Sequence, residues 1–568
     1  MRTRLLLLLV FVAAFLSGCD KAKETPAGYY YLPVIETTDI HGHIIERENG
    51  AVHYRMAYIA DKVRDIRGRG DAYRKDRLLL LDGGDIYQGA SVSNMLAGQP
   101  VTAAMDVMEY DAVALGNHEF DWGIELTVDA DGTMPDYERG GGRQVNEVPV
   151  VCANLYQDGS RAPFTKDYVI VEKTAVNAQG ESLRVRIGVI GFAEDYSGSI
   201  MTAAFKGRGF SIREDYTIAD ALAKELEASG RCDATVLLVH GAADRSAEQL
   251  GRDSAIDLVL GGHSHETLSG WTGAGTPYLQ GGRYCEHYSN ADFKFSVDRK
   301  TGKPTLAGVV SPFNFAVRAA LDQHVSEGQN ADDLDEDVLA LSDEAIAACN
   351  LQGGDVIGYI SFGATTYYIK GSGDRATPMS NWMCDILRRI GDADVAFVNS
   401  GGVRTSFPLG NQPWRDITVA DIYEMFPFNN LTYVYEISYA ELLRLFTYSL
   451  TNGGRGLFSF MSGIDCGYRD YSVVSLRKDG AVIYQDGRWT DDWATRTLRL
   501  AVSEYLATTS RVDNYTGMEN PLLQWNGTPR LLSNDLVDNE NAVRVLREEA
   551  TTSGGRLYID ASAHYILQ

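Results

Sequence analysis

Carboxylate, amide and imidazole side chains gather in five short segments of this chain, and each segment directly follows an apolar run. Five of the ten histidines lie in these segments. Two side chains that stand two residues apart in a short loop can point to the same place, so Asp-x-His and His-x-His pairs can each bind one centre. Glycines that precede several of them let the backbone pass close to a bound ion. The segments are Asp39-Ile40-His41, Asp82-Gly83-Gly84-Asp85, Gly116-Asn117-His118-Glu119, His240, and Gly261-Gly262-His263-Ser264-His265.

Imidazole and carboxylate ligands together indicate zinc, manganese or a related divalent ion rather than calcium. The segments hold more ligand-type side chains than one tetrahedral site needs. They suit two ions about 3.5–4 Å apart that share a bridging carboxylate. One such segment alone is usually structural, whereas five in order after five strands rarely arise from packing. The sequence therefore predicts a two-metal site.

The elements that must position these groups can be predicted from the apolar runs. The runs are short, and amphipathic stretches such as Val101 to Tyr110 lie between several of them. This alternation predicts a layered α/β domain, in which the loops after the strands meet at one edge of the sheet and bind ligands there. The predicted strands are Val34-Ile35, Leu78 to Leu81, Ala112 to Leu115, Ile187 to Ile190, Val236 to Val239 and Leu258 to Leu260.

An acidic stretch, residues 331–347, separates this half from a second one. Its apolar residues stand at helical spacing, which predicts an exposed linker helix between domains with solvated acidic residues. After about Leu351 the pattern restarts, with a strand predicted at Val395 to Val398 and a helix at Ser438 to Asn452 that opens with a capping box. The apolar residues of the linker are Leu334, Val338, Leu341 and Ala345.

The motifs of the first half closely resemble those of the calcineurin-like metallophosphoesterases, and in particular the 5′-nucleotidase family. The matching stretches are TTDIHGH from Thr37, LDGGDIYQG from Leu81, YDAVALGNHEFDWG from Tyr110, LLVHG from Leu237 and LVLGGHSHE from Leu258. The resemblance implies a four-layer α/β sandwich followed by a second, mixed α/β substrate-binding domain. It also implies two divalent ions, one held by Asp39, His41, Asp85 and His265 and the other by Asp85, Asn117, His240 and His263, with Asp85 as the bridge.

By the same resemblance, His118 is a catalytic residue and not a ligand. It would stabilise charge on the transferring phosphoryl group or protonate the leaving oxygen, and Asp121 would orient it. The two cations would bind the phosphate oxygens and supply hydroxide near neutral pH, so that no protein nucleophile is needed.

Two segments of the second half, Phe397 to Arg404 and Glu424 to Asn430, resemble substrate-binding segments of that family, although Ser400 replaces a family glycine. The likeness implies that Asn399 and Arg404 contact the nucleotide. Stacking on an aromatic ring accepts any base, which suits a broad nucleotide preference. The remaining candidates are Phe428 and Tyr505 for the two faces of a base clamp, Asp513 for a ribose hydroxyl, and Arg375 for a phosphate or carboxylate.

The stretch from Tyr505 to Tyr515 departs from the family pattern, because it is two residues longer and lacks the family's glycines. If this insertion displaces Tyr505 and Asp513, base recognition is looser or altered. The two halves would have to close on each other to bring phosphate to the metals, with the linker as the hinge.

The resemblance therefore implies hydrolysis of nucleoside 5′-monophosphates, a step of nucleotide catabolism. On the same fold, the alternatives are a 2′,3′-cyclic-nucleotide phosphodiesterase with 3′-nucleotidase activity and a hydrolase of UDP-sugars or nucleoside polyphosphates. A nucleotide-binding surface protein without catalysis and an adhesive or metal-binding lipoprotein are disfavoured by the intact ligand set. The expected domains are a signal peptide (1–18), a catalytic domain (29–330), a linker helix or hinge (331–355) and a substrate-binding domain (356–568).

The N-terminal segment has the features of an export signal. Arg2 and Arg4 precede an apolar run from Leu5 to Leu16, which is too short to span about 30 Å of hydrocarbon. The following Ser17-Gly18-Cys19 completes a stretch that resembles the bacterial lipobox, whose cysteine is lipidated. We therefore expect an exported protein, anchored by lipid at Cys19 to a bacterial membrane on the periplasmic or cell-surface side; an ordinary signal peptide is the alternative.

The composition limits the partners of this chain. Its 568 residues include 52 Lys+Arg and 77 Asp+Glu, for a formal net charge of -25. A protein this anionic does not suit a nucleic-acid polymer, because neutralising its phosphates requires clustered Lys and Arg. Small nucleotides remain possible if metal ions and a few arginines make the cleft locally positive. The pattern implies no protein partner and leaves open the physiological metal, the preferred nucleotide, the oligomeric state and any disulfide pairing of the six cysteines after Cys19.

Overall fold

Strand β1 (Tyr30–Thr37) joins the two leaves of a twelve-stranded sheet in the N-terminal half. It pairs in parallel with β4 (Leu79–Asp82) and antiparallel with β18 (His287–Val297) and β11 (Tyr168–Val176). The computed structural model describes residues 28–48, 51–197, 200, 204–298, 301–326, 334–363, 377–451, 460–470, 472–512, 519–560 and 564–567.

The strands predicted from the apolar runs are all present. One leaf continues from β4 through β5 (Ala112–Ala114) to β8 (Val150–Val151). The other contains β12 (Ser182–Ala193), β14 (Ala234–His240), β15 (Leu258–Gly261), β17 (Pro277–Gly281) and β16 (Thr267–Trp271), while β19 (Pro304–Ala316) pairs with β18. Strands buried on both faces consist of nearly unbroken apolar residues, which is why the runs were legible in the sequence.

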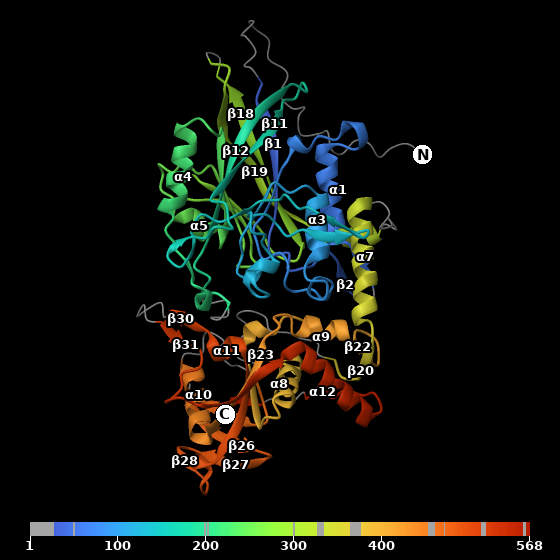
Figure 1. The fold of residues 1–568 in the computed structure, drawn as a ribbon, viewed down its shortest axis with the longest axis vertical. Coiled ribbons are helices and arrows are strands. Elements are labelled where there is room, and N and C mark those ends of the chain that lie inside the picture. The colour runs from blue at the N-terminus through green and yellow to red at the C-terminus, as the bar shows by residue number, and fades with distance from the viewer. Residues whose placement is uncertain are drawn as a thin grey trace.

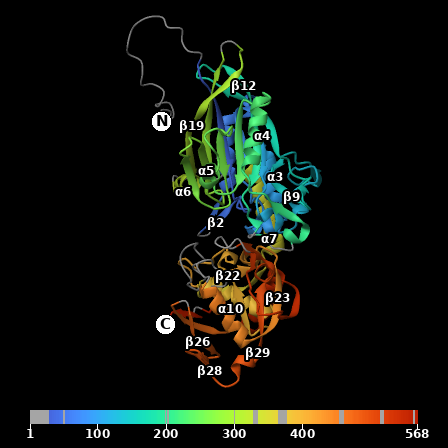
Figure 2. The same ribbon diagram turned by 90° about the vertical axis from the view of Figure 1, so that its left-hand side faces the viewer.

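Helices cover both outer faces of the two leaves and complete a four-layer sandwich, as expected (Figures 1 and 2). One apolar core, which includes Val34, Leu81 and Leu238, lies between the leaves. Two more cores lie under the helices. Helices α1 (Arg55–Arg67) and α3 (Gln99–Val107) pack on one leaf, and α4 (Thr217–Ala228) and α5 (Ala243–Glu248) on the other.

The acidic stretch forms helix α7 (Glu336–Gly353), and the prediction of an exposed helix holds only for its acidic face, where Glu336, Asp337, Asp343 and Glu344 are exposed. Leu334, just before the helix, and Val338, Leu341 and Ala345 within it are buried, and α7 packs on α1 and α3. Asp335 caps the helix by accepting a hydrogen bond from the Val338 N–H at 3.0 Å and also pairs with Arg64 at 2.8 Å. Apolar residues three to four positions apart share one face of a helix. In α7 this apolar face is wide enough to pack on the first half, although acidic residues dominate the sequence of the helix.

The C-terminal half is built on a five-stranded mixed sheet. Its order is β24 (Phe460–Ser462), β21 (Val395–Val398), β29 (Thr497–Ser503), β23 (Leu431–Ser438) and β32 (Arg530–Val537). Helices α8 (Pro378–Ile390) and α12 (Asp538–Ser553) share one core, and α10 (Tyr439–Thr451) contributes to the core that the short α11 (Glu504–Thr508) also borders. The strand at Val395–Val398 and the helix predicted from Ser438 are both confirmed.

The two halves meet end to end, and α7 runs along the first half toward the second (Figure 1). Helix α9 (Val419–Met425) of the second half contacts α7 and α2 (Ser91–Asn94) of the first. The Asn94 side-chain amide donates to the Tyr423 carbonyl at 3.2 Å. The two halves are therefore in direct contact through these helices.

The part of the chain with a predicted role at the membrane is not among the described residues. Within the described ranges, no helix has both the length and the apolar character needed to cross a membrane. Cys19 and the proposed export signal lie outside those ranges. Cys152 and Cys232 are buried, as expected of small apolar side chains.

Candidate metal and phosphoester site

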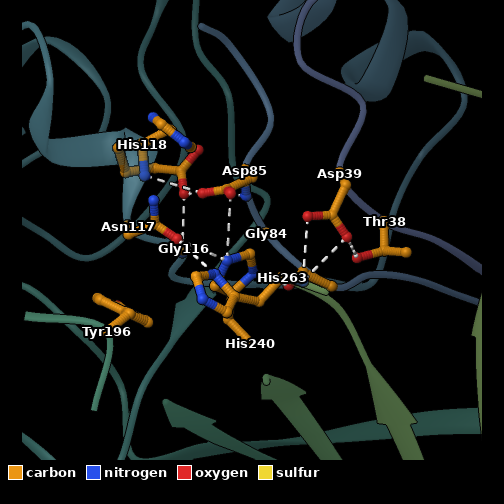
Figure 3. Close-up of polar contacts among 12 residues, drawn as sticks. Thr38, Asp39, Gly84, Asp85, Gly116, Asn117, His118, Tyr196, His240 and His263 are labelled. Carbon is orange, nitrogen blue, oxygen red and sulfur yellow. Dashed lines mark hydrogen bonds and ion pairs between the residues drawn. The ribbon is translucent and has the colours of Figure 1, made fainter. Parts of the chain in front are cut away.

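The five predicted segments converge at one edge of the sandwich. Strands β1, β4 and β5 lie parallel in one leaf, and β14 and β15 lie parallel in the other, so the loops after them meet. The side chains from these loops face one another across a small volume (Figure 3). Three sets of ligand-type residues have atoms within 4.8 Å of one another: Asp39, His41 and His265; His41, Asp85 and His118; and Asp85, His240 and His263.

Asp85 belongs to the last of these sets and also lies close to His41 of the first. Its Oδ2 is 3.7 Å from His41 Nε2 and 3.2 Å from His240 Nε2. The Asn117 amide oxygen joins the last set, at 3.2 Å from His240 Nε2 and 2.8 Å from His263 Nδ1. His265 Nε2 closes the first set, at 3.4 Å from Asp39 Oδ1 and 3.1 Å from His41 Nε2. All seven residues predicted as ligands are thus brought together.

Five of these seven residues have a left-handed backbone. The φ angles of Asp39, His41, Asp85, His263 and His265 lie between 49° and 68°. Such angles are uncommon for residues other than glycine, and they cluster where function requires a side chain to be aimed. Two loops support one another there, since the Asp39 N–H donates to the Gly84 carbonyl and the His41 N–H to the Asp85 carbonyl, both at 2.9 Å.

Glycines give the ligand side chains their close approach. A Cβ on Gly116 would lie 2.3 Å from Asp85 Oδ1, and one on Gly84 would lie 2.9 Å from His240 Nδ1. Gly84 also has a φ of +92°, which a side chain would strain. The glycines were predicted to let the backbone pass close to an ion. In the structure they let the backbone pass close to the ligand side chains themselves.

Backbone carbonyls fix the orientation of two imidazoles. His41 Nδ1 lies 2.7 Å from the Gln88 carbonyl, and His240 Nδ1 lies 2.7 Å from the Gly83 carbonyl. A carbonyl can only accept, so each Nδ1 carries a proton and each Nε2 is the nitrogen that faces the cluster, where it would bind a cation. This is the arrangement by which proteins prepare histidines to bind metal.

The charges of the cluster are strongly coupled. Burial raises the pKa of Asp39 to about 7, against the influence of His240. Burial alone would lower the pKa of His240, but the neighbouring Asp85 and Asp39 carboxylates raise it to about 10. Two buried carboxylates, four imidazoles and one amide oxygen pointing inward form a donor set that fits two divalent cations.

A supporting residue within the predicted segments had no assigned role. The buried Glu119 carboxylate accepts hydrogen bonds from the N–H groups of Gly116, Asp85 and Ile86 at 2.7, 3.1 and 2.8 Å. It therefore ties the loop after β5 to the loop after β4. Its place directly after His118 was the available signal, but nothing in the sequence showed that its side chain turns back to the backbone.

His118 lies beside the cluster and is held by Asp121. Its Nδ1 is 2.6 Å from Asp121 Oδ2, and its backbone N–H donates to Asp85 Oδ1 at 2.8 Å. Burial disfavours the charged imidazole, yet the carboxylates of Asp121 and Asp85 raise the pKa of His118 above its ordinary value of 6.5. The arrangement leaves Nε2 as the nitrogen that can exchange a proton with a bound molecule.

The second half reaches this site through Phe428 and Arg404. The Phe428 ring stacks on the His118 ring, with centroids 5.7 Å apart and planes 28° apart. The Arg404 guanidinium lies 5.3 Å from the centre of the Phe428 ring. Burial lowers the pKa of His265, and the positive charges of His41 and Arg404 lower it further.

The other predicted substrate residues are placed less completely. Asn399 lies at the end of β21, in the turn that leads to Arg404, where its carbonyl accepts from the Gly402 N–H at 3.0 Å. Tyr505 lies half-buried on α11, and its N–H donates to Asn430 Oδ1 at 3.3 Å. Arg375 and Asp513 lie outside the described residues.

Comparison with known proteins identifies two matching families along the chain. Residues 32–267 match calcineurin-like phosphoesterases, and residues 356–508 match the C-terminal domain of 5′-nucleotidases. A 5′-nucleotidase of Vibrio parahaemolyticus is 23% identical over 518 residues, which are 84% of this chain and 86% of that protein. The endonuclease YhcR of Bacillus subtilis is 24% identical over 451 residues, which are 75% of this chain, but this chain spans only 33% of that relative.

The likeness extends to the fold of solved structures. The crystal structure of a 5′-nucleotidase precursor from Thermus thermophilus superposes with a TM-score of 0.64 at 20% identity. The superposition covers 95% of this chain and 99% of that one. At this identity the likeness establishes a shared two-part fold.

Proposed function

This chain belongs to the 5′-nucleotidase family of calcineurin-like phosphoesterases, which are phosphoric ester hydrolases, and we propose that it hydrolyses nucleoside 5′-monophosphates to nucleoside and phosphate. The observation that carries the proposal is the position of His118. It lies between a cluster of seven ligand-type side chains on one side and Phe428 on the other. A nucleotide needs both neighbours, because its phosphate would bind at the cluster and its base would stack on Phe428.

Each ligand-type residue has a proposed role. Asp39, His41 and His265 would hold one cation, Asn117, His240 and His263 would hold the other, and Asp85 would contribute to both. Two bound divalent cations would neutralise the phosphate oxygens and acidify a water molecule that attacks phosphorus. Arg404 brings a positive charge from the second half to this site and pairs with the phosphate there.

His118 acts on the leaving group. Asp121 keeps Nδ1 protonated and raises the pKa of the ring, so the imidazolium can donate its Nε2 proton to the departing ribose oxygen or offset charge on the phosphoryl group. Phe428 gives the base a stacking surface, with Tyr505 as the second face. Asn399 and Asp513 are the proposed contacts to the nucleoside, and Arg375 is a further anion contact.

Hydrolysis of a panel of phosphate esters, followed by chromatography of the released products as well as by free phosphate, tests the activity and its specificity. The panel contains 5′-, 3′- and 2′,3′-cyclic nucleotides, UDP-glucose, a nucleoside triphosphate and single-stranded DNA, each with Mn²⁺, Zn²⁺ or a chelator. We expect the 5′-monophosphates to be the best substrates and the chelator to abolish release. Faster release from a 2′,3′-cyclic nucleotide or UDP-glucose would replace the proposed substrate. An inactive enzyme after metal is restored would overturn the enzyme assignment.

Two substitutions separate chemistry from metal binding. His118→Ala is expected to lower kcat by about 10²–10⁴-fold, the usual contribution of a general acid. Asp121→Asn should lower kcat less, because the imidazole remains in place with a weaker partner. Metal content, measured by elemental analysis, should stay at the wild-type level in both. A parallel loss of metal would show that His118 is a ligand.

We also propose that the protein is exported and anchored through a lipid on Cys19. The support is the apolar run from Leu5 to Leu16 that ends in the lipobox-like Leu16-Ser17-Gly18-Cys19. Cys19→Ser should move the protein from the membrane fraction to the soluble fraction of the producing bacterium. Membrane retention of that variant would refute the anchor.

A further inference from the structure

The first turn of helix α12 is bound to the loop that carries Phe428. The Asn539 side-chain amide donates to the Phe426 carbonyl at 3.3 Å and also to the Asn429 side-chain oxygen. The Asp538 N–H donates to the Asn430 carbonyl at 2.9 Å. Asp538 and Asn539 are 3% and 1% exposed, so these bonds are shielded from water.

Asn430 extends the network to the second proposed face of the base clamp. Its side-chain oxygen accepts from the Tyr505 N–H at 3.3 Å, at the start of α11. The neighbouring Leu431 N–H donates to the Glu504 carboxylate at 3.2 Å. One buried asparagine thus connects α12, the Phe428 loop and the helix that bears Tyr505.

The loop needs such support because its backbone is strained next to the stacking ring. Asn429 has a φ of +52°, directly after Phe428. A residue in this region persists only when its surroundings hold it there. The Asn429 side chain is the one that accepts from Asn539, so the bond restrains the residue that sets the direction of the Phe428 ring.

Only part of the Asn539 side chain serves its own helix: the side-chain oxygen accepts from the Glu540 N–H at 2.7 Å, whereas the amide group points away from the helix. The N-cap position of α12 is Val537, which has no side-chain cap. Asn541 supports this end of the helix instead, by donating to the Val537 carbonyl at 2.9 Å. The amide group of Asn539 is directed at residues 110 and 113 positions away in the chain. Buried polar networks that are satisfied in this way restrict the groups they join to one arrangement.

We propose that Asp538 and Asn539 are positioning residues for base recognition, which hold Phe428 and, through Asn430, Tyr505 in register to clamp the nucleobase. The inference rests on the proposed nucleotidase function and extends it to residues beyond the stretch, 356–508, that matches the C-terminal domain of 5′-nucleotidases. The hydrogen bonds described for Asp538 and Asn539 all stay within the second half, so their effect should fall on the base more than on the phosphate.

The test compares a substrate with a base and one without. The values of kcat, KM and kcat/KM are measured for a nucleoside 5′-monophosphate and for p-nitrophenyl phosphate, with metal content recorded for each protein. Asn539→Ala should lower kcat/KM for the nucleotide about tenfold or more through KM, since stacking on one aromatic face contributes at about that level. The ratio of nucleotide to base-free ester should fall by the same factor.

Two further variants keep the result interpretable. Asn541→Ala is the matched control, because it removes an asparagine of the same turn whose bond stays within the helix end. It should leave the ratio unchanged. Asn429→Gly removes the acceptor from the exposed side of the loop while tolerating the φ of +52°, and it should lower the ratio even if Asn539→Ala fails to fold.

The outcomes separate this inference from the function on which it rests. An unchanged ratio in folded Asn539→Ala, or in Asn429→Gly where that protein alone folds, with wild-type protein that prefers the nucleotide, overturns the positioning role alone. An equal loss for both substrates shows a purely structural role and overturns it as well. A wild-type protein that hydrolyses p-nitrophenyl phosphate with no preference for any nucleotide overturns both proposals.

Discussion

The buried carboxyl of Asp538 is expected to make the free energy of unfolding depend on pH. Burial raises its pKa from 3.8 to about 8, against the opposing hydrogen bonds from Asn539 and Asn430. In the window between these values the folded protein keeps the proton and the unfolded chain releases it. The contribution to stability is therefore complete below about pH 4 and is lost as the pH rises toward 8.

The size of the effect follows from the width of that window. Each pH unit corresponds to about 1.4 kcal/mol, so the buried acid costs about 4 kcal/mol at pH 7 relative to pH 4. Asp538→Asn removes the ionisation and keeps an oxygen to accept from the Asn539 N–H, which lies 2.8 Å from Asp538 Oδ1. The free energy of unfolding of the variant, relative to that of the wild type, should rise by about 1.4 kcal/mol for each pH unit between 5 and 8.

Urea unfolding of the two proteins at pH 5, 6, 7 and 8 measures this difference. Tryptophan fluorescence suits the purpose, because five of the seven tryptophans, Trp382, Trp414, Trp489, Trp493 and Trp525, lie in the C-terminal half. The other titrating groups are common to both proteins and cancel in the comparison. A gap between wild type and Asp538→Asn that stays constant from pH 5 to pH 8 would refute the reasoning.

Two further substitutions test the core and the metal site. Lys173→Met should lower the free energy of unfolding by about 3–5 kcal/mol, because it leaves the buried Asp111 carboxylate without its partner at 2.7 Å. Chemical denaturation should show a much smaller change for Lys62→Met, whose surface ion pairs are weak. Gly84→Ala should reduce metal content by elemental analysis, since the new Cβ would lie 2.9 Å from His240 Nδ1. Gly180→Ala, with a φ of +80° and open space around it, should strain the backbone equally and leave the metal content intact, so a loss in both would contradict the packing argument.

The catalytic half could be predicted from the sequence because its chemistry is local to strand ends. An apolar run such as Leu78 to Leu81 marks a strand buried on both faces, and the residues after it must emerge at the sheet edge. The glycines next to Asp85 could be predicted to lie at this edge for the same reason, because they follow the strand directly. What could not be predicted is the left-handed backbone of Asp39 or His265, because Asp and His adopt it more often than most residues but still only in a minority of cases.

The failures came from long-range packing. The acidic residues of α7 suggested exposure, but Val338 is fully buried because the rest of the chain presents a groove for its apolar stripe. The stack of Phe428 on His118 joins residues on different halves, and no sequence pattern encodes the angle at which two halves meet. Asn539 reaches Phe426 across 113 positions within the second half, and no local sequence pattern marks that contact.

The formal charge of -25 and the binding of an anionic substrate are reconciled by where the charges lie. Burial raises the pKa values of Glu36 and Asp82, behind the site, well above their ordinary values, so these acids contribute less negative charge than the formula counts. The ligand set of the first half still contains two carboxylates, and cations held there would reverse the local sign. Arg404 adds its guanidinium from the second half, beside Phe428. Under the proposed function, the phosphate needs the first set of charges and the base needs the ring that Arg404 accompanies, so we expect substrate affinity to depend on both halves together. The 5.7 Å between the Phe428 and His118 rings leaves no room for a base between them, so in this arrangement the base of the proposed nucleotide substrate would have to stack on the other face of Phe428.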